Sequence, residues 1–96
     1  MDVKLKRKER LVSLLHGAAS SFIRMEADPN AMVTVVRTEL SDNEQMVKFY
    51  ISIFPDSKEK EVFDFLKKKI KNLKNFMKPK IKTKYLPEID FEMEKG

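Results

Sequence analysis

The sequence predicts an α+β domain in which helices cover one face of a three-stranded sheet, in the order α-β-β-α-α-β. Three observations lead to this prediction. Apolar residues recur at spacings of three and four over residues 6 to about 26 and again over residues 62–81, as on one face of a helix. Residues 32–40 are rich in β-branched side chains, and residues 45–54 alternate between apolar and polar, as strands do. Residues 88–94 alternate in the same way and predict the third strand.

The length of 96 residues predicts one domain, 1–96, with residues 1–5 as a candidate for disorder, because a second domain would need a second core. The chain has two glycines and no cysteine, which argues against a glycine-rich phosphate loop, a disulfide framework and a thiolate metal site. Its charged beginning lacks the apolar stretch of a signal peptide, and no apolar run approaches the ~18 residues of a membrane span. We therefore expect a cytoplasmic protein.

The first predicted helix should end before Pro29, because the residue that precedes a proline is disfavoured in the α region. It is followed by the first two strands, whose short connection at residues 41–44 predicts an antiparallel pair. The expected buried face of this helix consists of Leu11, Leu14, Leu15, Ala18, Phe22 and Met25.

Alternation assigns the strand residues to two faces of the sheet. Acidic side chains alternate along the third strand, and we expect them on the outer, solvated face rather than in a metal site or a catalytic pair. The predicted inward residues are Val47, Phe49, Ile51 and Ile53 of the second strand and Ile89, Phe91 and Met93 of the third, and the predicted outward acids are Glu88, Asp90, Glu92 and Glu94.

The helical pattern of residues 62–81 is interrupted by Pro79. A proline inside a helix removes a hydrogen bond and clashes with the carbonyl four residues earlier, at a cost of ~3 kcal/mol. We therefore expect a kink or break between about Lys69 and Pro79, which divides this stretch into two helical pieces.

Residues 66–84 carry the strongest functional signal. Nine of these nineteen residues are lysine and none is acidic, so this segment has a charge of +9 while the rest of the chain sums to −4. A concentrated positive field attracts phosphates. The pattern predicts a polyanionic partner, with nucleic acid as the first candidate and an anionic membrane as the second.

Lysine is a point charge that suits phosphate contacts better than the reading of bases, so for a nucleic acid we expect recognition of its backbone and shape. Stacking on Phe76 in this segment and on Tyr85 directly after it should be a minor contribution. On a straight helix Lys67, Lys71, Lys74 and Lys78 would form one stripe, and a kink would leave residues 67–74 clustered. The predicted RNA-binding residues are Lys67, Lys68, Lys69, Lys71, Lys74, Lys78, Lys80, Lys82 and Lys84, extended by Arg7, Lys8 and Arg10 if the first helix lies beside them.

Three alternatives compete with nucleic-acid binding. A charge run is often only a solvated helix face. The amphipathic stretch 63–81 could instead bind a membrane surface or a protein partner. An enzyme has the least support, because His16 is the only histidine and is expected to be packed or solvated rather than catalytic. We predict no catalytic residue, no metal and no cofactor.

Several segments, taken in order, resemble the ribosome-binding factor A family of bacterial small-subunit assembly proteins. The most specific is Leu-Pro-Glu-Ile-Asp-Phe at residues 86–91, which is similar to the family's Pro-Glu-Leu-x-Phe motif. The other matching segments are the basic residues 6–10, Asp28-Pro29, Val-Thr-Val at 33–35, Glu-Leu-Ser at 39–41 and Val-Lys-Phe-Tyr-Ile-Ser at 47–52.

The resemblance implies a type II KH-like fold, which is an RNA-binding architecture. It also implies a non-catalytic monomer that binds 16S rRNA on the immature small ribosomal subunit and assists rRNA processing and subunit maturation, with no small-molecule substrate and no membrane. In this family a helix interruption, often Ala-x-Gly, replaces the usual KH loop. It would fall at Lys69-Ile70-Lys71, which contains neither Ala nor Gly, so the break is either absent or moved toward Pro79.

Overall fold

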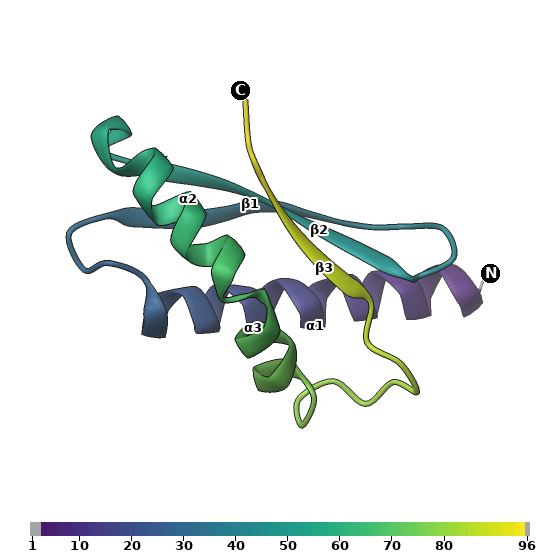
Figure 1. Cartoon of the computed structure of the whole chain (residues 1–96). Helices are drawn as coiled ribbons and strands as arrows, with labels where there is room; N and C mark the ends of the chain where they lie inside the picture. Colours follow the sequence, from purple (N-terminus) through teal and green to yellow (C-terminus); the bar gives the residue numbers. More distant parts are fainter. Residues whose placement is uncertain (1–2, 96) are drawn as a thin grey trace.

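Figure 1 shows the computed structural model of the protein, which describes residues 3–95. The expectation of disorder at residues 1–5 remains untested for residues 1 and 2, which lie outside that range, while the first helix begins at Val3. The order of elements confirms the predicted α-β-β-α-α-β arrangement. The elements are α1 (Val3–Glu26), β1 (Met32–Leu40), β2 (Met46–Phe54), a short 3-10 turn η1 (Asp56–Lys58), α2 (Glu59–Lys68), α3 (Ile70–Met77) and β3 (Glu88–Met93).

The three strands form one sheet in the order β1-β2-β3. β1 and β2 are antiparallel as predicted, and β3 lies parallel to β2 after the crossover through α2 and α3. A β-bulge interrupts the pairing between Val35 and Arg37, which the sequence pattern did not predict. The extra residue, Val36, keeps Leu40 directed into the core while Arg37 pairs with Tyr50.

The core lies between one face of the sheet and the three helices (Figure 1). The predicted inward residues of β2 are buried, as are Ile89 and Phe91 of β3, and Met93 packs partly buried against them. Burial of this apolar surface is the main favourable contribution to folding. The side chains that are almost completely buried include Leu15, Val47, Phe49, Ile51, Leu66, Leu73, Met77 and Phe91.

The predicted buried face of α1 is partly wrong. Leu14 and Met25 are exposed, whereas Ala19 and Ile23 are buried. A helix lying against a sheet buries a broad stripe at i, i+3, i+4, i+7 and i+8 rather than a narrow one. That stripe is Leu15, Ala18, Ala19, Phe22 and Ile23, with Leu11 and Val12 packed at its edge.

The break between α2 and α3 falls at Lys69, at the start of the predicted interval, so the expectation that it is absent or moved toward Pro79 was wrong. Lys69 has φ −96° and ψ 5°, and its backbone N–H donates to the carbonyl of Leu66 at 3.0 Å. These angles are open to any residue, so the break requires neither Ala nor Gly. Leu66 and Leu73 are fully buried on either side of it. α3 then ends at Met77, before Pro79.

Candidate nucleic-acid interface

Three of the predicted RNA-binding lysines are paired with carboxylates. Lys67 Nζ donates to Asp90 Oδ1 at 2.8 Å, and Lys74 Nζ donates to Glu88 Oε1 at 3.0 Å. Lys69 Nζ lies 3.7 Å from Glu26 Oε1. The acids come from β3 and α1, which are distant in sequence, so the absence of acids within residues 66–84 does not leave these lysines without neutralising partners.

The lysines that follow α3 are placed differently. Lys78, Lys80, Lys82 and Lys84 are all exposed and make no ion pair with another described residue. Their segment is held in place by Ile81, whose side chain is buried and whose N–H donates to the carbonyl of Met77 at 2.9 Å. Lys68 and Lys71, on α2 and α3, are likewise exposed.

The first helix extends this group of cations, as predicted, but through only two of the three residues named. Arg7 and Arg10 line a hollow of about 190 Å³ together with Lys82, Thr83 and one acid, Glu44. Lys8 instead turns toward the β1–β2 connection, where its Nζ lies 3.4 Å from Asp42 Oδ1.

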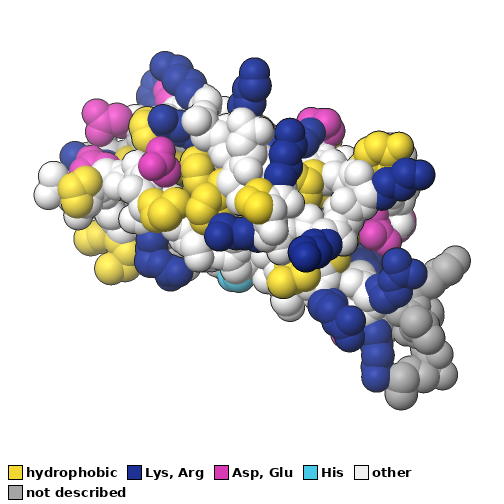
Figure 2. Space-filling view, turned by 90° about the horizontal axis from the view of Figure 1, so that it is seen from below, with side chains coloured by type: hydrophobic (Ala, Val, Ile, Leu, Met, Phe, Trp, Pro, Cys, Tyr) yellow, Lys and Arg dark blue, Asp and Glu magenta, His cyan; other side chains and the backbone are white. Residues whose placement is uncertain are grey.

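We call the resulting surface the basic end. In Figure 2, Lys and Arg side chains predominate on the right half of the visible face, toward the N-terminus. Exposed cations that make no ion pair within residues 3–95 can bind phosphates without first breaking one. The basic end consists of Arg7, Arg10, Lys78, Lys80, Lys82 and Lys84.

Two aromatic side chains lie within the same region. Phe76 is half-buried, packs against Phe22 with ring centroids 5.6 Å apart, and carries Lys80 Nζ at 4.6 Å from its centroid. Tyr85 is exposed, with Lys84 Nζ 5.7 Å from its ring. The sequence placed one in the basic segment and the other directly after it, but could not show that only one of them presents its ring to solvent.

The outer face of the sheet carries a balanced ionic network. Arg37 bonds to both Glu39 and Glu94, and the hydrogen bond to Glu94 is the main cause that raises the pKa of Arg37. Tyr50 donates its hydroxyl to Glu39 at 2.9 Å, which is the main cause that lowers the pKa of the Glu39 carboxyl. Lys48 pairs with Glu92 at 3.1 Å. Each cation here already has an acidic partner, so this face is a poor candidate for phosphate binding.

The four acids of β3 were all predicted to lie on the outer face of the sheet, and the structure divides them into two pairs. Glu92 and Glu94 join the outer network. Glu88 and Asp90 instead pair with helical lysines, because α2 and α3 lie beside this strand at the edge of the sheet.

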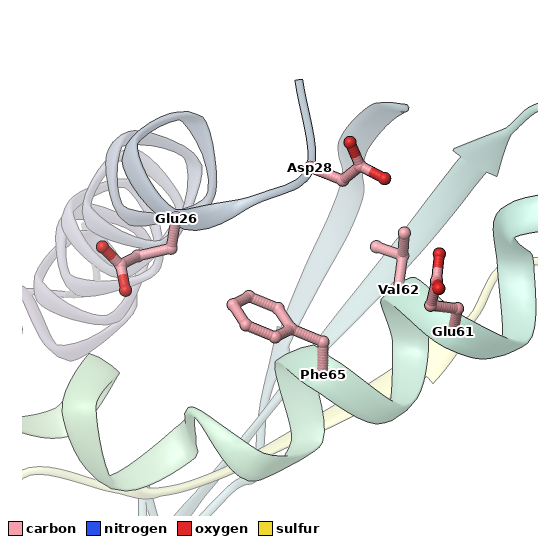
Figure 3. A pocket seen from close by; sticks show the side chains of 5 residues that line it. All are labelled: Glu26, Asp28, Glu61, Val62 and Phe65. Atoms are coloured by element: carbon pink, nitrogen blue, oxygen red, sulfur yellow. The ribbon is translucent and has the colours of Figure 1, made fainter. Parts of the chain in front are cut away.

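A pocket between α1 and α2 differs from the basic end in having a partly acidic lining. It has a volume of about 320 Å³ and is lined by Glu26, Asp28, Glu61, Val62 and Phe65. Figure 3 shows the Phe65 ring reaching from α2 toward the end of α1. The backbone N–H of Asn30 and then the ammonium of Lys58 lower the pKa of Asp28. The neighbouring cations Lys58 and Lys69 already pair with Asp28 and Glu26, so within residues 3–95 the pocket offers no unpaired cation to a phosphate.

Three further observations concern the histidine, metal binding and membrane spans in residues 3–95. His16 packs as predicted, with its Nδ1 sharing a hydrogen bond of 2.9 Å with Thr38 Oγ1. Among residues 3–95 no three His, Cys, Asp or Glu side chains gather where they could hold a metal ion. No helix in that range has the length and apolar character needed to cross a membrane.

Comparisons with known proteins agree on one family. The family model described as ribosome-binding factor A matches residues 7–96. A ribosome-binding factor A from Clostridium tetani is 38% identical over 74 residues, which cover 73% of this chain and 61% of the relative. Another, from Caldanaerobacter subterraneus, is 34% identical over 92 residues, which cover 92% of this chain and 75% of the relative. The chain thus spans less than two thirds of the first relative.

Solved structures show the same fold. The crystal structure of ribosome-binding factor A from Thermus thermophilus has a TM-score of 0.79 at 22% identity, covering 90% of this chain and 93% of that one. A Thermus thermophilus ribosome-binding factor A model fitted into a cryo-EM map of a 30S complex has a TM-score of 0.74 at 22% identity, covering 84% of this chain and 88% of that one.

Proposed function

The chain belongs to the ribosome-binding factor A family, and we propose that it binds 16S rRNA on the immature small ribosomal subunit and assists its processing and maturation. We place this activity in the cytoplasm and in one domain spanning residues 1–96. The Thermus thermophilus relative has been fitted into a 30S complex, which supports the choice of subunit.

The basic end is the observation that carries the proposal. Its cations are exposed and come from α1 and from the segment after α3. We propose that they contact phosphates, and that Lys68 and Lys71 extend the contact along the helices. Lys67, Lys69 and Lys74 are already paired, so they contribute less unless RNA displaces their acidic partners.

The proposed mechanism is non-catalytic. Phosphate contacts position a protein on RNA without reading its sequence, so specificity would come from the shape of a folded rRNA surface. Binding energy would then favour the rRNA conformation that fits the basic end, because a ligand shifts an equilibrium only by its differential affinity for the two states.

The alternative of a membrane-surface module loses its main support. It required the apolar side of residues 63–81 to be exposed, but Leu66, Leu73 and Met77 are fully buried against the sheet. An interfacial helix needs that face to enter the lipid.

Co-sedimentation with small and large ribosomal subunits across a salt series tests the proposal. We expect wild type to bind the small subunit selectively, with log K falling by ~0.7–0.9 per phosphate contacted as log salt rises. The variant Lys82→Ala/Lys84→Ala should bind more weakly and with a shallower slope. Its matched control is Lys60→Ala/Lys95→Ala, which also removes two exposed lysines but lies away from the basic end.

The outcomes separate the possibilities. Equal binding to both subunits and to bulk RNA would reduce the protein to a generic basic RNA-binding domain. Loss of binding in both double variants would show that net charge, rather than the basic end, is responsible. Absence of binding at low salt would contradict the proposal.

A further inference from the structure

Tyr85 is unusually exposed for an aromatic residue. Its relative exposure is 78%, the highest among the large hydrophobic side chains that the structure describes as exposed. A single exposed aromatic ring is common on protein surfaces, so exposure alone indicates no site. The setting of Tyr85 distinguishes it, because its ring stands beside lysines that make no ion pair within residues 3–95.

The backbone that carries this ring is held in place. Thr83 Oγ1 donates to the carbonyl of Tyr85 at 2.9 Å. On one side of the segment the side chain of Ile81 is buried, and on the other Pro87 is buried and Glu88 N–H donates to the carbonyl of Gln45 at 2.9 Å. A ring on an anchored segment loses little conformational entropy when it binds a ligand.

The ring borders a hollow with cations at its rim. The hollow has a volume of about 460 Å³, within the ~300–1,000 Å³ typical of small-ligand pockets. Of its cations, Lys74 is paired with Glu88, whereas Lys78 and Lys84 make no ion pair within residues 3–95. Its lining residues are Lys74, Lys78, Ile81, Thr83, Lys84, Tyr85, Leu86 and Glu88.

Other exposed or partly exposed aromatic residues lack this combination. Tyr50 has the guanidinium of Arg37 3.7 Å from its ring centroid and its hydroxyl bonded to Glu39. Phe65 lines the acidic pocket at the other end of the molecule. Phe54 is 69% exposed but adjoins that same end, where η1 and α2 begin.

We propose that Tyr85 and this hollow form a stacking subsite for one unpaired nucleotide of single-stranded RNA, with Lys78 and Lys84 binding the flanking phosphates. An aromatic ring flanked by cations is the usual platform for single-stranded nucleic acid, and it accepts any base because every base has a π-face. Bases in a duplex are already stacked and cannot reach the ring. The inference rests on the proposed function and specifies the form of RNA that the basic end binds.

Titration of wild type and variants with a short fluorescent oligoadenylate tests this subsite. A second oligomer with the same phosphates but abasic sugars isolates the stacking contribution. We expect Tyr85→Ala to weaken oligoadenylate binding by about 5-fold to 150-fold, the range measured for loss of one stacked base. Tyr85→Ala should leave abasic binding and the salt slope unchanged. Tyr85→Phe should bind like wild type, and so should Phe54→Ala, which removes another largely exposed ring at the end of the molecule that carries the acidic pocket.

Three results would overturn the subsite: unchanged oligoadenylate binding by Tyr85→Ala, an equal loss for the abasic oligomer, or no binding of oligoadenylate by wild type. Circular dichroism melting of Tyr85→Ala checks that the fold is retained. Co-sedimentation with subunits separates the two proposals. Selective small-subunit binding without any effect of Tyr85 would refute the stacking subsite alone. Base-dependent oligomer binding without subunit binding would refute the ribosomal function alone.

Discussion

Lys74 Nζ lies 3.0 Å from Glu88 Oε1, so a lysine of α3 is neutralised by the first residue of β3. Lys67 of α2 forms a similar pair with Asp90, which lies two residues further along β3 on the same face. These pairs neutralise the two lysines beside β3, whereas Lys68, Lys71 and the lysines after α3 make no ion pair within residues 3–95. This pairing explains why charge counting overestimates the number of lysines available to RNA.

Releasing a paired lysine should strengthen RNA binding. Glu88→Gln removes the partner of Lys74 near the basic end, and we expect tighter binding of small-subunit rRNA with a salt slope steeper by up to ~0.7. Asp64→Asn is the matched control, because it releases Lys60 at the other end of the molecule. Equal effects of the two variants, measured by RNA titration across salt concentrations, would attribute the gain to net charge.

Substitution by alanine should destabilise the protein more at a buried leucine than at an exposed one. Leu73 is fully buried, and Leu73→Ala should lower the free energy of unfolding by about 2–5 kcal/mol through lost burial and a cavity. Leu14 is 48% exposed, and Leu14→Ala should cost clearly less. Urea denaturation measures both. Similar losses in the free energy of unfolding would contradict the exposed position of Leu14 on α1.

The helix break should not favour glycine. Because Lys69 has φ −96°, an alanine fits there without strain, and glycine adds only entropy to the unfolded chain. We expect Lys69→Gly to be less stable than Lys69→Ala by about 0.4–1 kcal/mol in urea denaturation. Both variants lose the contact with Glu26, so their difference isolates the backbone. A more stable glycine variant would indicate a left-handed conformation at the break.

Lowering the pH should remove the stabilisation that the charged carboxylate of Asp28 gives to the folded state. The pKa of Asp28 lies below its ordinary 3.8 in the folded state, first because of the Asn30 N–H and then because of Lys58. A lowered folded-state pKa stabilises the protein above 3.8, and this contribution is lost as pH falls through the lowered value. Asp28→Asn keeps an acceptor for Asn30 but loses the charge.

We therefore expect the urea midpoint of Asp28→Asn to lie below that of wild type at neutral pH. The difference should shrink once the pH is below the folded-state value. A difference that stays constant down to strongly acidic pH would show that the charge of Asp28 is unimportant.

Most of the fold could be predicted from the sequence, because the spacing of apolar residues indicates which side chains are buried. The alternation in β2 and β3 correctly identified the inward residues, and Pro79 correctly limited α3. The bulge at Val36 could not be predicted, since β-branched residues on both sides of it give the same strand signal. The buried face of α1 was also predicted only in part, because Leu14 and Ala19 lie at opposite edges of the apolar stripe and the sequence does not show which edge is buried.

The candidate site was less predictable than the fold, for a physical reason. Ion pairs such as Lys67 with Asp90 join residues 23 positions apart, and composition cannot reveal them. The proximity of Arg7 and Arg10 to Lys82 likewise depends on how α1 crosses the segment after α3. The exposure of Tyr85 had one signal in the sequence, its position in a lysine-rich segment after Pro79, outside any predicted helix or strand.

The acidic pocket at one end of α1 and the basic end near the other give the molecule a permanent electric dipole. α1 runs along the length of the molecule, whose longest extent is 45 Å (Figure 1). In the field of a polyanion such a dipole experiences a torque, which turns the cations forward while the protein is still diffusing. Orientation would then be selected before contact, so that a larger share of encounters begins with Arg7, Arg10 and the segment after α3 facing the target.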